Sequence, residues 1–189
     1  MNNLMIDIET LGTGKNAVII SLGAVFFCPE TGNLGAGFYQ TITRGSCELY
    51  GLEADEDTVR WWSEQSAEAR AVLTCPDAGD LDDTLREFAG WLWESTEEGS
   101  DIHVWGNGPS FDNAILANAY NRCNVKLPWK FRHERCVRTI VALGRELLGI
   151  DPKKTIERKG THHHALADAE HQALYVSAVY QALKAKVAE

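Results

Sequence analysis

The sequence predicts an α/β fold: a mixed sheet, formed by an antiparallel meander and then parallel strands, with helices on both faces. Three observations support this prediction. Apolar runs joined by tight turns open the chain, amphipathic helical patterns then alternate with a further short strand, and a long Ala-rich helix ends it. Strands that come first, followed by helices in alternation with strands, are typical of such a layered arrangement.

The first three strands are expected within the first 43 residues. Residues 4–8 (LMIDI) form a short apolar run with β-branched side chains, as buried strands do. The turn GTGKN separates them from a second apolar run at residues 17–27. PETGN is a hairpin-type turn, and residues 38–43 (FYQTIT) alternate like a third strand. Tight turns between the three strands predict an antiparallel meander.

Five later segments repeat apolar side chains with the spacing of a helix. They are residues 55–73, 81–93, 111–121, 138–148 and 165–186. Asp55 or Asp57 is expected to cap the first helix, and Ser110 the third. Gly149 follows the fourth helix, where a glycine with left-handed backbone commonly ends a helix.

The remaining segments connect these elements. Residues 102–105 (IHVW) form a short strand, and residues 124–135 are expected to be irregular because Pro128 breaks any helix there. Residues 151–163 form a polar, basic loop. The chain has 189 residues and shows no repeat, low-complexity tract or linker, so we expect a single domain over residues 1–189.

The composition is that of a globular protein. Hydrophobic residues make up 44% of the chain, and no apolar run approaches the ~20 residues that a membrane helix needs. The start, MNNLMIDIET, lacks the basic segment of a signal peptide. Scattered cysteines without a C-x-x-C pair favour reduced thiols and a cytoplasmic location. The cysteines are Cys28, Cys47, Cys75, Cys123 and Cys136.

The net charge of −9 hides an uneven distribution of charged residues. Residues 1–121 contain 5 Lys and Arg against 20 Asp and Glu, whereas residues 122–159 contain 11 against 4. A basic segment inside an acidic chain can follow a phosphate backbone. The alternative is a solvated loop and helix face, and the charge alone leaves both interpretations open.

Two carboxylates stand together near the start of the chain, in Asp7-Ile8-Glu9. Residues i and i+2 of a strand point to the same face, so Asp7 and Glu9 lie side by side. Two carboxylates that close repel each other unless a cation or a proton intervenes, and a hard divalent ion prefers such oxygen ligands. The alternative for this short motif is a strand end with two solvated acids.

Two other segments add candidate functional groups. Asp112 lies in the first turn of a helix. It either interacts favourably with the helix dipole or is a third carboxylate of a metal cluster. His163 stands five residues before Asp168, near the start of the last helix. The run from His162 to His164 is not expected to bind zinc, because adjacent residues do not converge on one tetrahedral ion and no Cys pair accompanies them. A single imidazole beside carboxylates suits a general base.

Together these segments resemble the DEDD-type 3′–5′ exonucleases of the His subclass (DEDDh), which have the ribonuclease H-like fold. The motifs are IDIET (6–10), WGNGPSFDNAIL (105–116) and HHALADA (163–169), in the order of the family. With TVRWWSEQS (58–66), the chain looks closest to small bacterial and phage exoribonucleases and exodeoxyribonuclease VIII-like proteins. The resemblance implies a metal-dependent 3′–5′ exonuclease with a ribonuclease H-like mixed sheet.

The resemblance also implies hydrolysis with two Mg²⁺ or Mn²⁺ ions. Asp7, Glu9 and Asp168 would hold one ion. Asp7 would bridge to the second ion, and Asp112 would complete the cluster. His163 would take the proton from the attacking water. An acidic pocket is then expected in a nuclease, because the ions supply the positive charge that the phosphate needs.

Individual residues can be assigned further. The five-residue spacing of the family before Asp168 selects His163 as the base, with His164 as the alternative. Trp62 shares an apolar helix face with Val59 and is expected in the core, so Trp61 is preferred for stacking on a base. Seven residues are candidates for contacts with the substrate: Thr10, Leu11, Trp61, Asn107, Gly108, Ser110 and Phe111.

The expected partners are the 3′ ends of RNA or DNA and, by resemblance, a second copy of the chain in a homodimer. Basic side chains before His163 are candidates for phosphate contacts. They are Arg135, Arg138, Lys153, Lys154, Arg158 and Lys159. The sequence does not distinguish RNA from DNA. Two other hypotheses stay open: a domain that binds 3′ ends without cutting them, and a hybrid-cleaving endonuclease.

Overall fold

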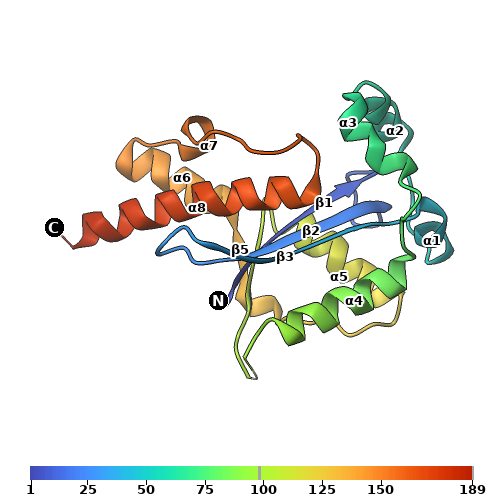
Figure 1. The fold of residues 1–189 in the computed structure, drawn as a ribbon, viewed down its shortest axis with the longest axis horizontal. Coiled ribbons are helices and arrows are strands. Elements are labelled where there is room, and N and C mark those ends of the chain that lie inside the picture. The colour runs from blue at the N-terminus through green and yellow to red at the C-terminus, as the bar shows by residue number, and fades with distance from the viewer. Residues whose placement is uncertain (98, 189) are drawn as a thin grey trace.

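The structure, a computed structural model, describes residues 1–97 and 99–188. Within these residues, the strands form one five-stranded sheet with the order β3-β2-β1-β4-β5 (Figure 1). The strands are β1 (Asn3–Thr10), β2 (Ile19–Phe27), β3 (Leu34–Thr41), β4 (His103–Gly106) and β5 (Glu134–Cys136). The pairs β1/β2 and β2/β3 are antiparallel, and β1/β4 and β4/β5 are parallel. The predicted mixed α/β sheet is therefore confirmed.

Helices surround this sheet. In the described residues they are α1 (Arg44–Leu49), α2 (Glu56–Ser63), α3 (Ala67–Arg70), η1 (Ala71–Thr74), α4 (Leu81–Glu94), α5 (Asp112–Arg122), η2 (Phe131–His133), α6 (Val137–Leu148), α7 (Pro152–Thr155) and α8 (Ala165–Val187). None of these helices has the length and apolarity to cross a bilayer.

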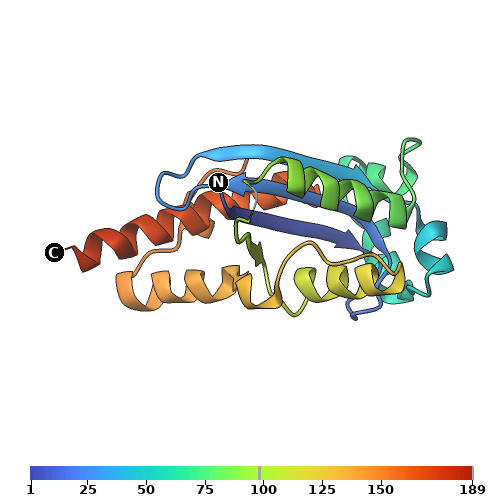
Figure 2. The ribbon, with the colours of Figure 1, turned by 90° about the horizontal axis from the view of Figure 1, so that it is seen from below.

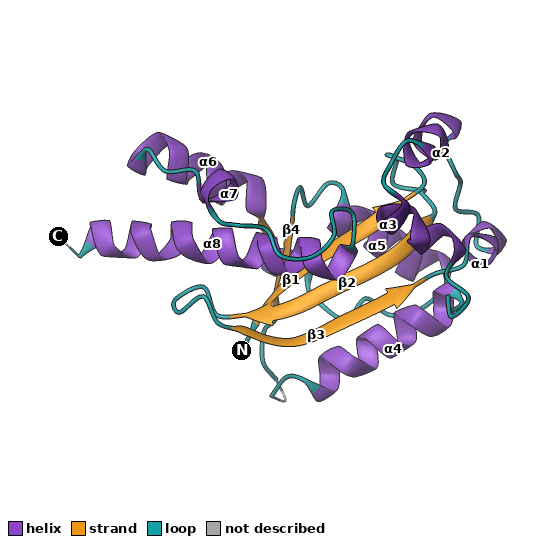
Figure 3. Ribbon diagram, turned by 45° about the horizontal axis from the view of Figure 1, so that its top comes forward, coloured by secondary structure: helices purple, strands orange, loops and turns teal. Residues whose placement is uncertain are grey.

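The two faces of the sheet bury different side chains of β1. Leu4, Ile6 and Ile8 pack into a core with α4 and α5, whereas Met5 packs into a second core with α6 and α8. Figure 2 shows α4 near β3 and α5 near β1, and Figure 3 shows α8 on the opposite face. Because side chains alternate along a strand, Asp7 points to the same face as Met5, toward α8.

The helix predicted over residues 55–73 is wrong as one continuous element. Asp55 does cap its beginning, by accepting a hydrogen bond from the Asp57 amide. The chain then leaves the helix after Ser63 and restarts at Ser66, whose hydroxyl accepts from the Ala69 amide at 3.2 Å. Serine competes with the helical backbone for hydrogen bonds and favours caps, so it divides the segment.

Three other predictions need correction. Ser110 does not cap α5, because a turn in which the Phe111 amide donates to the Gly108 carbonyl places the start of the helix at Asp112. The segment predicted as irregular, residues 124–135, contains η2 and the start of β5. Helices α1 and α7 have only a turn or two each and were not predicted. Gly149, with a φ of +68°, ends α6 as predicted.

Candidate active site

Three carboxylates from two ends of the chain meet above the sheet. Asp7 and Glu9 project from the same face of β1, and Asp168 projects from the first turn of α8. One oxygen of each lies within 4.8 Å of the other two. The prediction that Asp7 and Glu9 lie side by side thus agrees with the structure, and the packing of α8 on the sheet adds the third acid.

Gly23 allows α8 to come this close. It lies opposite Asp7 in the register of β1 with β2, so it faces the same side of the sheet. A Cβ on Gly23 would collide with the backbone of Ala165 and Leu166, at the start of α8. The missing side chain therefore sets the distance between the sheet and the helix that carries Asp168.

Asp112 approaches from the other side of β1. Strands β1 and β4 are parallel, so their carboxyl ends lie at one edge of the sheet, and the chain turns there into α5. Asp112 begins this helix and is only 3% exposed. Burial raises its pKa to about 7, although backbone amides, among them those of Ile8 and Asn107, counteract the shift.

The carboxylates raise the pKa values of one another. Burial, followed by the negative charges of Asp168 and Asp112, raises the pKa of Glu9 to about 8. The pKa of Asp7 lies well above its ordinary value, first through burial and then through Asp112 and Glu9. Such a cluster binds protons or cations, because the isolated negative charges are unfavourable in a buried place.

Two side chains partly balance this negative charge. Gln172 Nε2, from the second turn of α8, donates a hydrogen bond of 2.7 Å to Asp7 Oδ1. The Arg158 guanidinium forms an ion pair with Asp168 Oδ1. The other oxygen of Asp168 accepts a hydrogen bond of 3.2 Å from the His163 amide. The loop before α8 is thus tied to the acidic cluster through Asp168.

His163 lies beside the carboxylates in an unusual conformation. Its φ of +61° belongs to the left-handed region, which few residues other than glycine adopt and which is enriched at functional sites. The edge-to-face contacts of its ring are with Trp61, at 5.0 Å between centroids, and with Trp62, at 6.0 Å. Burial lowers the pKa of His163, so the imidazole is neutral at neutral pH and can accept a proton.

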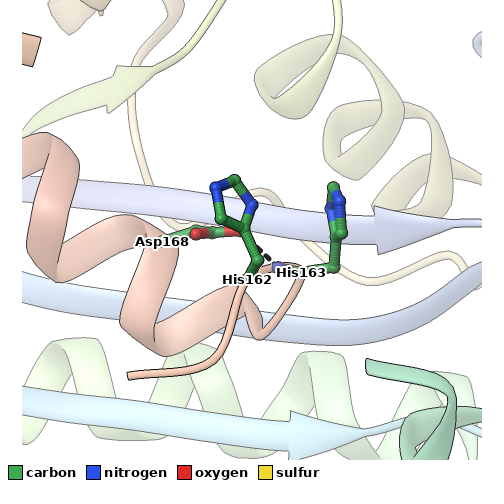
Figure 4. A group of neighbouring side chains, drawn as sticks. All are labelled: His162, His163 and Asp168. Carbon is green, nitrogen blue, oxygen red and sulfur yellow. Dashed lines mark hydrogen bonds between the residues drawn. The ribbon is translucent and has the colours of Figure 1, made fainter. Parts of the chain in front are cut away.

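The three consecutive histidines have separate environments. His164 caps α8 through Nδ1, which accepts from the Ala167 amide at 3.4 Å, and its ring stacks on Tyr39 at 4.1 Å. Its position at the helix cap sets it apart from His163, which lines the cavity described below. The other two histidines were not expected to converge on one ion, but they do lie close together. One ligand atom each of His162, His163 and Asp168 lie within 4.8 Å of one another (Figure 4).

The cluster opens into a cavity of about 490 Å³. Seven of the predicted site residues line it: Asp7, Glu9, Asn107, Phe111, Asp112, His163 and Asp168. Five predicted residues are not part of this lining, namely Thr10, Leu11, Trp61, Gly108 and Ser110. All residues predicted to take part in catalysis therefore line one cavity, whereas only some of those predicted to contact the substrate do.

The two adjacent tryptophans differ as the helix pattern predicts. Trp62 is 1% exposed and its Nε1 donates a hydrogen bond of 2.8 Å to the Thr10 carbonyl. Trp61 is 41% exposed and contacts His163 with part of its ring. Thr10 and Leu11 are both buried, and the Thr10 hydroxyl donates to the Gly12 carbonyl. Trp61 is the member of this group whose ring remains accessible to a ligand.

The basic residues of the predicted phosphate-binding segment are also divided. Arg138, Lys153 and Arg158 line the cavity. Lys154, next to Lys153, instead lies 3.8 Å from an oxygen of Asp151. The remaining two are not in the lining: Arg135, which donates to backbone carbonyls, and Lys159, which is exposed. Half of the predicted basic residues therefore line the same cavity as the acidic cluster.

Several residues of the cavity were not predicted from the sequence. Gln172 has the most direct contact, through its hydrogen bond to Asp7. Its signal was present in the sequence, because a residue four positions after Asp168 on a helix lies on the same face. His171 and Tyr175 also line the cavity, although their helix carries few signs of a site apart from Asp168.

Comparisons with known proteins agree with this geometry. A family model described as "3′-5′ exoribonuclease Rv2179c-like domain" matches residues 2–180. The chain belongs to this family. A curated relative, the exodeoxyribonuclease of Enterobacteria phage T4, is 28% identical in an alignment 161 residues long that covers 74% of this chain and 70% of that protein. The resemblance predicted from the three motifs is confirmed.

Solved structures share the fold. The nuclease domain of 3′hExo, a DEDDh family member bound to rAMP, has a TM-score of 0.64 and 13% identity, and the match covers 96% of this chain and 92% of that one. Exonuclease I of E. coli in complex with a dT13 oligonucleotide has a TM-score of 0.70 and 16% identity. That match covers 98% of this chain and 42% of exonuclease I, so the chain spans less than half of it.

These findings establish the class of the protein. It is a 3′–5′ exonuclease that acts on nucleic acid, and its sheet is that of the ribonuclease H-like fold. The cluster of Asp7, Glu9 and Asp168 provides acidic groups that can bind a divalent metal ion.

Proposed function

We propose that the protein removes nucleotides from the 3′ end of single-stranded or 3′-overhanging RNA or DNA, with two divalent ions and a histidine general base. One observation carries this proposal. Asp7, Glu9 and Asp168 converge within 4.8 Å, in a cavity whose wall also contains His163. Carboxylates and a neutral imidazole in one polar cavity are the groups that a metal-assisted phosphodiester hydrolysis needs.

The donor set fits a hard ion, Mg²⁺ or Mn²⁺. Buried carboxylate oxygens with raised pKa values are relieved of their mutual repulsion by a divalent cation. Asp7, Glu9 and Asp168 would hold one ion. Asp7 would also contact the second ion, and the buried Asp112 would complete the cluster. Bound there, the ions would stabilise the attacking and leaving oxygens of the reaction.

His163 would act as the general base. As the water oxygen attacks phosphorus, the imidazole takes one proton from that water. The bond from phosphorus to the 3′ oxygen breaks, this oxygen stays on the shortened strand and takes a proton from solvent, and a nucleoside 5′-monophosphate leaves. The neutral state of His163, which follows from the lowering of its pKa by burial, suits this role at neutral pH. The contacts of its ring with Trp61 and Trp62 would hold the imidazole at the edge of the cavity.

The substrate contacts are assigned by position. Phe111 and Asn107, in the cavity wall, would touch the terminal nucleotide. The exposed ring of Trp61 would stack on a base. Thr10 and Leu11 would support the strand end against which the 3′ nucleotide lies, and Gly108 and Ser110 would shape the turn before α5. Among the basic residues that line the cavity, Lys153 and Arg138 would meet phosphates, whereas Arg158 pairs with Asp168.

An end-labelled oligonucleotide tests the proposal. With Mg²⁺ or Mn²⁺, a 5′-labelled strand should shorten stepwise from its 3′ end. Matched RNA, single-stranded DNA and duplex substrates then show which nucleic acid is preferred. The family description names an exoribonuclease, whereas the phage relative is an exodeoxyribonuclease, so both substrates belong in the assay.

Single-residue variants of the protein, tested in the same assay, separate the roles of the residues. His163→Ala should lower turnover about 100-fold or more, as expected for the loss of a general base, and should retain metal-dependent binding. Asp7→Ala should abolish turnover. Full activity of His163→Ala would exclude it as the base. Internal cuts would indicate an endonuclease, and a shifted but intact substrate would indicate a domain that binds without cutting.

We also propose a cytoplasmic homodimer. The Trp93 side chain on α4 is 72% exposed and provides apolar surface for a contact between copies. Light scattering of the purified protein tests the oligomeric state, and Trp93→Glu should favour the monomer. A monomer at all concentrations of the unaltered protein would contradict this part of the proposal.

A further inference from the structure

Two successive histidines each place one ring nitrogen near the same carboxylate. In an extended chain, neighbouring side chains point to opposite sides, but the left-handed φ of +61° at His163 changes this direction. Figure 4 shows both imidazoles on the same side of the loop that precedes α8. The ring centroids of His162 and His163 lie 5.1 Å apart, and one ligand atom of each is within 4.8 Å of the other and of Asp168.

The donor chemistry of this trio differs from that of the carboxylate cluster. Two imidazole nitrogens and one carboxylate oxygen are typical ligands of Zn²⁺ and related borderline ions, with the fourth position left for water or another ligand. Asp7, Glu9 and Asp168 instead offer oxygen atoms alone, which suit Mg²⁺ or Mn²⁺. The two groups share Asp168, so one ion competes with the other for that carboxylate.

His162 is free to take part. Its side chain is exposed, it lines the cavity, and within the described residues its imidazole makes no hydrogen bond. The next but one residue, His164, is already occupied as the cap of α8 and by its stacking on Tyr39. The structure therefore selects one pair from the three histidines.

We propose that His162, His163 and Asp168 form an inhibitory site for Zn²⁺ or a similar borderline divalent ion. An ion bound there would occupy the imidazole nitrogen of His163 that accepts the proton and would draw Asp168 away from the carboxylate cluster. The inhibition rests on the proposed role of His163 as the base, whereas the binding of the ion does not. Because Arg158 pairs with Asp168, the ion also competes with that guanidinium.

Calorimetric titration of the whole protein with Zn²⁺, in the presence of excess Mg²⁺, tests the site directly. His162→Gln removes one ligand and should weaken Zn²⁺ binding about tenfold or more, because even the removal of a residue that only hydrogen-bonds to a metal ligand lowers metal affinity 10–100-fold. The matched control is His133→Gln, which alters another paired histidine whose ring lies 5.6 Å from that of His103. This control should bind Zn²⁺ like the unaltered protein.

A parallel activity assay tests the inhibition. In Mg²⁺ without Zn²⁺, His162→Gln should degrade the oligonucleotide like the unaltered protein, and it should need about tenfold more Zn²⁺ for half inhibition. Unchanged Zn²⁺ affinity in His162→Gln would overturn the proposal, and so would Zn²⁺ binding that depends on Asp7 but not on His162. Unimpaired activity of His163→Ala would instead refute the proposed base, and the titration would still decide whether the ion binds.

Discussion

Gln172 and Asp7 are joined by a hydrogen bond of 2.7 Å between Nε2 and Oδ1. Gln172 is 5% exposed and lies one helical turn after Asp168. One face of α8 therefore supplies an acid of the cluster and also an amide that orients a second acid, on β1. Partners of this kind fix the direction of metal-ligand candidates and commonly change metal affinity or activity by 10–100-fold when removed.

Replacement of this amide should impair the reaction without unfolding the protein. Gln172→Leu, which keeps the volume of the side chain but not the donor, is expected to lower turnover or Mg²⁺ affinity about tenfold. Gln181→Leu is the matched control, because Gln181 lies on the same helix and donates to the Pro29 carbonyl, away from the cavity. Equal activity of the two variants would show that the hydrogen bond to Asp7 has no part in catalysis.

The absence of a side chain at Gly23 should be equally important. Gly23→Ala forces the start of α8 away from the sheet, since its Cβ would overlap the backbone of Ala165 and Leu166. Overpacking of this kind costs about 2 kcal/mol of folding free energy, and here it also displaces Asp168. Denaturant unfolding and the nuclease assay should both show the loss.

A second glycine provides the control for this substitution. Gly90 lies within α4, and a Cβ there meets nothing within 4 Å. Gly90→Ala should therefore stabilise the protein by about 0.5–1 kcal/mol, because alanine favours the helix, and should leave activity unchanged. If Gly23→Ala behaved like Gly90→Ala, close packing of α8 would not be what positions Asp168.

The parts of the site that follow from local periodicity could be predicted from the sequence. The two-residue period of a strand placed Asp7 beside Glu9, and the helical pattern identified Trp62 as the buried member of its pair. The register that brings Asp168 to them depends on the packing of α8 on Gly23, which no local pattern reveals. Only the order of the motifs, through the family resemblance, connected the two ends of the chain.

The differences between the predicted and the observed structure also have local causes. A run of three histidines does not indicate the left-handed φ at His163, nor that ring nitrogens of His162 and His163 lie within 4.8 Å of each other. The strand β5 has three half-buried residues, too few for a period to appear. Residues 55–73 have a helical pattern throughout, but the cap formed by Ser66 interrupts the helix.

The raised pKa values of the acids predict how stability depends on pH in the absence of divalent ions. Glu9 and Asp112 have pKa values of about 8 and about 7 in the folded protein, against roughly 4 in an unfolded chain. Between these values the folded state binds more protons than the unfolded state, so stability should fall as the pH rises from about 5 to 8. Thermal unfolding in a chelator measures this slope.

Two additions sharpen this experiment. Mg²⁺ should raise the melting temperature more at pH 8 than at pH 6, because it competes with protons for the same carboxylates. Asp112→Asn removes one titrating group and should make the slope shallower, whereas Asp77→Asn, which removes an exposed acid outside the cavity, is the control for charge alone. A melting temperature that rises toward pH 8 in the chelator would contradict the assignment of raised pKa values.

Neighbouring lysines allow a test of the phosphate contacts. Lys153 lines the cavity, whereas Lys154 lies 3.8 Å from Asp151 and is 79% exposed. Lys153→Ala should raise KM several-fold and lower the slope of log affinity against log salt concentration by about one, because one phosphate contact is lost. Lys154→Ala changes the net charge equally and should alter both quantities much less. Long-range attraction of the substrate depends on the net charge of the loop, whereas a direct contact depends on the position of the lysine. Equal changes in KM and in salt dependence for the two variants would therefore mean that the basic loop acts only through its overall charge.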